Sequence, residues 1–152
     1  MNLWLNSFEF LIYHGLYSLT DGASASNHIQ NTIASDTSGL INLCLDSIAA
    51  LRTDPNLQGI HISVGLSNFA LGAPKSMQVA LERAFLRLAM DAGMDFALAN
   101  PEKNTVPLAH DAKLVRDLSR VLDEGRVHLG ESAEDAGYRQ LDALMDLWSD
   151  PN

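Results

Sequence analysis

The segment from Gly59 to Pro101 constrains the fold of this chain more than any other part of it. It reads GIHISVGLSNFALGAPKSMQVALERAFLRLAMDAGMDFALANP. A β-branched alternating run, a glycine-bounded loop, an amphipathic stretch and a second apolar run follow one another in it. That order predicts a strand, loop, helix and strand, the building block of parallel α/β folds. We therefore predict an α/β fold.

The patterns within this segment predict the bounds of its elements. Alternation predicts a first strand over residues 59–64, and a continuous apolar run predicts a second strand over 96–99 that is covered on both faces. Ser76 is the expected N-cap of the intervening helix, and Gly93 its expected C-cap. The side chains expected on the buried face of that helix are Val79, Ala80, Phe85, Leu86, Ala89 and Met90.

Apolar periodicity predicts three further helices outside this segment. Asp54-Pro55 would end the first of them, and Gly125 would close the second. Ser132 and Asp135 occupy capping positions at the start of the third. The three helices are expected over residues 40–51, 111–122 and 132–148. The apolar positions of the last one are Tyr138, Leu141, Leu144, Met145 and Trp148.

Size and charge narrow the possible classes of protein. The chain has 152 residues with 47% apolar content, which suits one domain over residues 1–152. Its net charge of −9 argues against binding to nucleic acid or to an anionic membrane, because both need clustered Lys and Arg. Cys44 is the single cysteine, which fits a reducing compartment, and the cytoplasm is the expected location.

The first 32 residues form an apolar segment followed by a polar loop, ahead of the β/α region over 33–152. Residues 1–20 are apolar and aromatic but lack a basic start, and Asn6, Glu9 and His14 interrupt them. This pattern favours a buried or partner-facing helix over a signal peptide or a membrane span.

Polar side chains stand where both predicted strands end. Ser67 and Asn68 follow the first strand, and Asn100 follows the second. Ligands of α/β proteins bind at the carboxyl ends of strands, and a neutral amide can donate or accept a hydrogen bond there. The alternative is structural: Ser67 and Asn68 would only form a turn and cap the next helix, and Asn100 would be a turn residue before Pro101.

The run Val64 to Asn68 (VGLSN), followed by Gly72 and Pro74 and then by ERAFLRLAMDAGMDFALANP, carries a family resemblance. It resembles the last third of the pterin-binding barrel shared by dihydropteroate synthases and methyltetrahydrofolate-dependent methyltransferases, and is most similar to the methyltransferase branch. The upstream stretch IASDTSGLINLCLDSIAALRTDPNLQG is similar to the link between the sixth and seventh strands of that barrel. The resemblance covers residues 33 to 148.

The resemblance implies a reaction and a site. It implies methyl transfer from methyltetrahydrofolate to a corrinoid held by a partner protein. Asn68 would form the hydrogen bond near the nitrogen that carries the methyl group, with Ser67 and Asn100 beside it. Asp36 matches a place where a substrate-facing carboxylate could lie, although a carboxylate ahead of a helix is usually a cap. Asp95, which also matches the family, would begin a strand at the opposite edge, and we interpret it as structural.

The chain is shorter than the family's barrel, which needs about 250 residues. Residues 1–32 match none of the pterin-binding carboxylates and asparagines that the family places on earlier strands. The sequence therefore predicts a half-barrel-like β/α unit, with the missing strands supplied by a companion chain or by a second copy. One alternative is a noncatalytic half-barrel subunit that pairs with itself or with another chain. Another is a small α/β protein that keeps the motif only as scaffold.

Other catalytic patterns are absent from the sequence. HISVG and GLSNF each lack one glycine of a nucleophile elbow, so no serine hydrolase is implied. The five histidines are scattered without metal-ligand spacing, so no metal site is implied. Cys44 falls in an apolar helical stripe and is expected to be a core thiol rather than a nucleophile.

Overall fold

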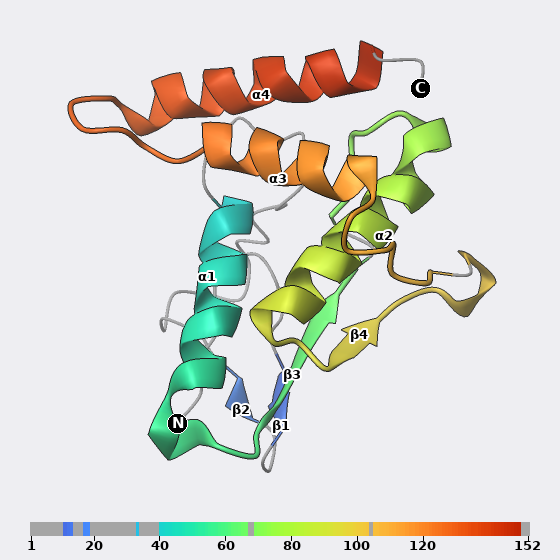
Figure 1. Ribbon diagram of the computed structural model, residues 1–152, viewed down its shortest axis with the longest axis vertical. Coiled ribbons are helices and arrows are strands. Elements are labelled where there is room, and N and C mark those ends of the chain that lie inside the picture. The colour runs from blue at the N-terminus through green and yellow to red at the C-terminus, as the bar shows by residue number, and fades with distance from the viewer. Residues whose placement is uncertain are drawn as a thin grey trace.

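The protein is described here by a computed structural model. The described residues are 11–13, 17–18, 33, 40–66, 69–103 and 105–149, with backbone alone for 11–13, 17–18 and 40. They form a mixed sheet and a set of packed helices (Figure 1). The predicted combination of helices and strands is therefore confirmed.

The sheet contains four strands in the order β2-β1-β3-β4. The strands are β1 (Leu11–Tyr13), β2 (Tyr17–Ser18), β3 (His61–Gly65) and β4 (Phe96–Leu98). β3 and β4 run parallel, with Ser63 opposite Phe96 and Gly65 opposite Leu98. β1 is antiparallel to both of its neighbours. The predicted parallel pair is thus one half of a sheet whose other half is an antiparallel hairpin.

The hairpin corrects the prediction for the N-terminal segment. A helix was expected there, but residues 11–13 and 17–18 are strands. The physical reason is a tertiary one, because β1 pairs with an edge of β3 that would otherwise present unpaired backbone groups. The segment therefore covers one edge of the parallel pair within the same chain.

The helices match the predicted bounds to within a few residues. They are α1 (Leu40–Thr53), α2 (Lys75–Ala92), α3 (Lys113–Glu124) and α4 (Ala133–Ser149), with short 3-10 turns η1 (Pro55–Leu57) and η2 (Pro101–Lys103). α2 packs against α1 and α3, and α4 packs on the outer side of α3 (Figure 1). Ser132 and Asp135 cap α4 as predicted, since the Ser132 hydroxyl accepts from the Asp135 N–H at 3.1 Å.

The two ends of α2 differ in how well they were predicted. Gly93 is the predicted C-cap, in the left-handed conformation with φ of 114°. Ser76 is not the N-cap: Pro74 occupies that position without a side-chain cap, and Ser76 lies inside the first turn. The carbonyl of Pro74 already accepts from the N–H groups of Met77 and Gln78, so the helix begins earlier than predicted.

The buried face of α2 is also shifted from the predicted one. Val79 and Met90, expected inside, are exposed. Phe85, Leu86 and Ala89 are buried as predicted, and the buried face extends to residues that were not predicted. Its buried members are Leu81, Glu82, Ala84, Phe85, Leu86 and Ala89.

Strand β4 lies where it was predicted but is not covered on both faces. Its side chains are exposed, with Phe96 and Leu98 each 55% accessible. The reason is that α3 and α4 pack on the other helices and on each other, so β4 stays at the open edge of the sheet.

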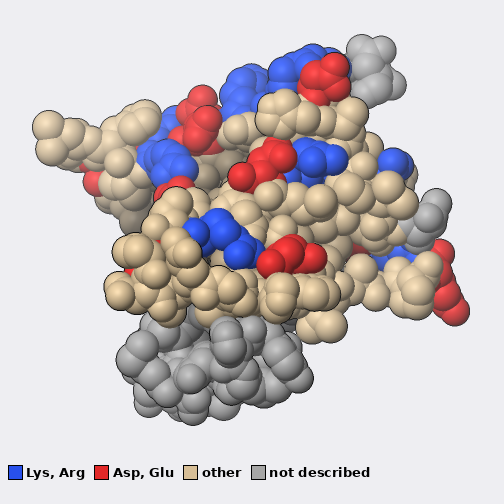
Figure 2. Space-filling model, turned by 60° about the horizontal axis from the view of Figure 1, so that its bottom comes forward, with Lys and Arg blue, Asp and Glu red and all other residues tan. Residues whose placement is uncertain are grey.

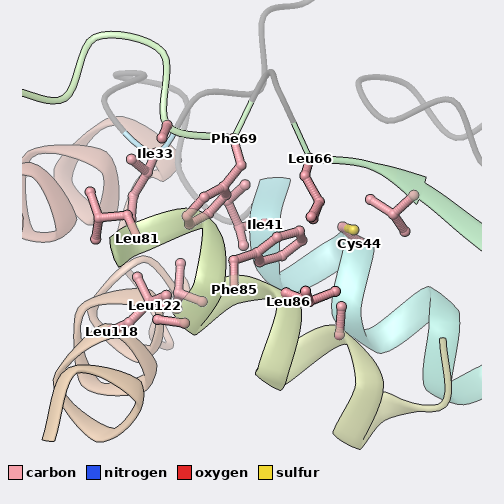
Figure 3. Close-up of a cluster of buried hydrophobic side chains, with 14 of the residues drawn as sticks. Ile33, Ile41, Cys44, Leu66, Phe69, Leu81, Phe85, Leu86, Leu118 and Leu122 are labelled. Atoms are coloured by element: carbon pink, nitrogen blue, oxygen red, sulfur yellow. The ribbon is translucent and has the colours of Figure 1, made fainter. Parts of the chain in front are cut away.

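The core lies between the helices and the sheet (Figure 3). It includes Phe69, which follows the loop after β3. Phe69 and Phe85 are fully buried and stack with ring centroids 4.3 Å apart. Burial of each phenylalanine contributes about 2 to 3 kcal/mol. Ile33, also buried, donates its N–H to the Phe69 carbonyl at 3.0 Å. Phe69 is therefore anchored through both its side chain and its backbone.

Candidate functional site

The carboxyl ends of β3 and β4 lie side by side. The N–H of Leu66, one residue beyond β3, donates to the carbonyl of Leu98, the last residue of β4, at 2.9 Å. The segments that follow the two strands consequently leave the sheet at the same end. We call this end, formed by the carboxyl ends of β3 and β4, the shared edge. This is the edge at which α/β proteins bind their ligands.

The residues predicted to bear the chemistry are only partly within the described chain. Ser67, Asn68 and Asp36 lie outside the described residues. Their neighbours Leu66 and Phe69 are both buried, and the Phe69 N–H donates to the Leu66 carbonyl at 3.2 Å. The two residues that flank Ser67 and Asn68 are therefore fixed in the core at the shared edge.

Asn100 is exposed at the shared edge. It forms a turn before Pro101, which was the structural alternative for this residue. Its side-chain oxygen accepts from the Glu102 N–H at 2.9 Å, and its carbonyl accepts from the Lys103 N–H at 3.1 Å. These bonds begin η2. The amide nitrogen of Asn100 takes no part in them, so it is the part of this side chain that a ligand would meet.

An ion pair between a buried carboxylate and a partly exposed lysine lies at this turn and was missed in the sequence. Glu82 of α2 is 2% exposed, and its Oε1 accepts from Lys103 Nζ at 2.8 Å. The pair joins α2 to the segment that follows β4. A signal was available, because Glu82 stands three residues before Phe85 and seven before Ala89, on the apolar stripe of the helix.

Asp95 lies at the amino-terminal ends of β3 and β4, opposite the shared edge. The sequence predicted a structural role for it. Its Oδ1 accepts from the Ile62 N–H at 2.8 Å, and its Oδ2 from Arg52 at 2.8 Å and His61 at 3.1 Å. Partial burial by itself would raise the pKa of Asp95, but the hydrogen bonds from Ile62, His61 and Arg52 outweigh it and lower that pKa. Asp95 ties α1, β3 and β4 together, and its structural role is confirmed.

A second polar arrangement lies in a hollow of about 380 Å³ between α2 and α3. His110 Nδ1 lies 2.8 Å from Asp91 Oδ2, and Arg116, Ser119 and other side chains line the hollow. The His110 side chain is 82% exposed, so the hollow does not shield a proton transfer from water. Asp91 is nine residues beyond Glu82 on α2, about 13 Å along the helix and away from the shared strand edge.

The remaining chemical groups are buried or dispersed. Cys44 is buried, and desolvation raises the pKa of its thiol, so the predicted core role is confirmed. Within the described ranges no three His, Cys, Asp or Glu side chains are grouped to hold a metal ion. On the face shown in Figure 2, basic groups lie beside acidic ones rather than in one continuous patch. No helix among the described elements is long and apolar enough to cross a membrane.

Comparison of the chain with family models, with curated proteins and with solved structures found no match. The likeness to the pterin-binding barrel therefore depends on the residues quoted from the sequence, with Val64 to Asn68 at their centre.

Proposed function

We propose that this chain is part of a pterin-binding β/α domain and takes methyltetrahydrofolate as its substrate. The observation that supports this most is the parallel unit of β3, α2 and β4, whose strands end side by side at Gly65 and Leu98. A ligand-binding edge of an α/β protein needs this geometry. β3 ends at Gly65, inside the motif VGLSN.

In this proposal the polar side chains of the shared edge orient the pterin. Asn68 would hydrogen-bond N5 and stabilise a proton there, so that the nitrogen leaves as a neutral amine when the methyl group departs. Ser67, Asn100 and Asp36 would be the substrate contacts around it. A corrinoid on a partner protein would supply the nucleophile. A neutral amide suits this role because it adds no charge to a desolvated pocket.

The open edge at β4 supports an assembly with further strands. Phe96 and Leu98 are more than half exposed, and β4 has β3 as its neighbour in the described sheet. Exposed apolar edges favour pairing with another strand. We propose that a companion chain or a second copy supplies the rest of the pocket, in the cytoplasm, where one unpaired cysteine is compatible with the reducing conditions.

A second candidate function is a noncatalytic half-barrel subunit that pairs with itself or with another chain. The antiparallel pairing of β1 with β3 favours it. A complete barrel of this family has eight parallel strands, so a further parallel strand would lie where β1 lies here. In this case the exposed β4 edge would serve pairing alone.

Calorimetric titration of the folded chain with methyltetrahydrofolate tests the first proposal. Saturable binding that is lost in Asn68→Ala and kept in Asn56→Ala would support it, because Asn56 lies in η1 ahead of β3 rather than at the shared edge. Absence of binding by the folded chain would contradict a pocket formed by this chain or by two copies of it. Size-exclusion chromatography with light scattering tests the second function, and a stable monomer would contradict pairing of the chain with itself.

A further inference from the structure

Helix α4 carries one broad apolar face. Its centre is buried against α3 and includes Leu144 and Leu147. Its margin, which we call the α4 flank, consists of side chains spaced three, four and three residues apart, so that they follow one line along the helix. The α4 flank comprises Tyr138, Leu141, Met145 and Trp148.

The α4 flank has room for a partner. Tyr138 is 56% exposed and Met145 is 54% exposed, whereas Leu141 and Trp148 reach partly into the core. α4 lies outermost, with α3 beneath it (Figure 1). Tyr138 and Met145 extend the apolar face of α4 beyond the part that α3 covers, and apolar side chains left exposed on one side of a helix indicate a further contact.

Acidic side chains line the solvent side of the flank. Asp142 and Asp146 are exposed one turn apart, and in the described part of the chain no ion pair involves either of them. The nearest basic residue on the helix, Arg139, is already engaged by Glu124 and Glu131. The exposed apolar side chains of the flank are therefore bordered by two carboxylates, Asp142 and Asp146, that no described basic side chain neutralises.

We propose that the α4 flank is a docking surface for a basic amphipathic helix of another protein. An apolar stripe on that helix would cover Tyr138 and Met145, and its Lys or Arg side chains would face Asp142 and Asp146. A second copy of this chain fits less well, because it would place two acidic rims together in a protein that already carries a net charge of −9. This surface is independent of the proposed folate site.

The test uses the full chain and a synthetic acetylated peptide of leucine and lysine, with the leucines three and four residues apart. Calorimetry at about 0.15 M salt is expected to show saturable binding that weakens as salt is added. Tyr138→Ser combined with Met145→Gln is expected to weaken binding by about tenfold or more. Asp142→Asn combined with Asp146→Asn is expected to weaken binding and to reduce its salt dependence.

Two matched variants control for nonspecific apolar and electrostatic binding of the peptide elsewhere on the surface. Leu43→Gln removes an exposed apolar side chain from α1, and Glu102→Gln removes an exposed carboxylate from η2. Both should bind the peptide as the parent chain does. Three outcomes would overturn the proposal: no saturable binding, unchanged binding in the Tyr138 and Met145 variant, or a dimer of the parent chain in sedimentation that this variant dissociates.

Discussion

The side chain of Arg52 lies across Gly93. Arg52 Nε donates to the Gly93 carbonyl at 2.8 Å, and a Cβ added to Gly93 would come within 2.7 Å of Arg52 Cγ. Gly93 also has φ of 114°, a conformation that side chains rarely adopt. The helix end and the arginine that joins α1 to it therefore both depend on the absence of a side chain at this position.

Gly93→Ala should lower the free energy of unfolding by about 2 kcal/mol, because backbone strain adds to the displacement of Arg52. Urea unfolding of the two proteins measures the difference. Gly59→Ala is the matched control, since Gly59 has φ of 81° but nothing within 4 Å of its added Cβ. It should cost only about 1 kcal/mol, from strain alone. Equal losses in the two variants would show that Arg52 contributes nothing.

The carboxylate of Asp95 should make stability depend on pH in the acid range. Because its folded pKa is lowered, its contribution is present above the unfolded pKa of about 3.9 and is lost as the pH falls toward the folded pKa. Asp95→Asn should cost about 1 kcal/mol at neutral pH, a modest value because the group is one-third exposed. Its stability should also fall less steeply than that of the parent chain below about pH 4.

Asp95→Ala separates the charge from the backbone contact. Asparagine keeps an oxygen for the Ile62 N–H, whereas alanine leaves that donor without its partner. The alanine variant should therefore lose about 1 kcal/mol more than the asparagine variant. Identical unfolding curves for the two variants at neutral pH would show that the contact with Ile62 contributes nothing to stability.

Cys44 should not react with a thiol-specific reagent in the native protein. The thiol is buried, and desolvation raises its pKa, so the reactive thiolate is both scarce and inaccessible. Because Cys44 is the single cysteine, the same reagent in urea should modify one thiol per chain and provide the control. Rapid labelling without denaturant would contradict its place in the core.

The sequence predicted the positions of β3, α2 and β4 because their signals are local. The alternation through Ile60, Ile62 and Val64 and the stop at Gly93 each depend on a few neighbouring residues. The exposure of Phe96 could not be predicted in the same way. A short apolar run indicates a strand, but whether helices cover both faces of that strand depends on how distant elements pack.

The same limit applies to the N-terminal segment and to Glu82. The aromatic residues around Tyr13 fit a helix or a strand, and the available edge of β3 decides between them. The pair formed by Glu82 was missed because its partner, Lys103, is 21 residues away in sequence, in the turn after β4. Of the candidate site, the shared edge was predictable, because the carboxyl ends of neighbouring parallel strands lie at the same end of a sheet.

Removal of Lys103 alone from the Glu82–Lys103 pair should lower the free energy of unfolding more than removal of both partners. Lys103→Met leaves a carboxylate that is 2% exposed without its cation, and should cost about 2 kcal/mol, a discounted value because Lys103 is one-third exposed. Replacing both partners, by Glu82→Leu with Lys103→Met, should cost less than Lys103→Met alone, because no buried charge remains. Chemical unfolding of the two single variants and the double variant gives the coupling energy.

The exposed pair of Asp46 and Arg126 is the matched control for that cycle. Both of its side chains are about half exposed, so Asp46→Asn should cost less than about 0.5 kcal/mol. A Lys103→Met variant no less stable than Asp46→Asn would show that Glu82 does not depend on its partner. A large coupling energy would instead establish that this buried pair fixes the segment after β4, and with it the position of Asn100 at the shared edge.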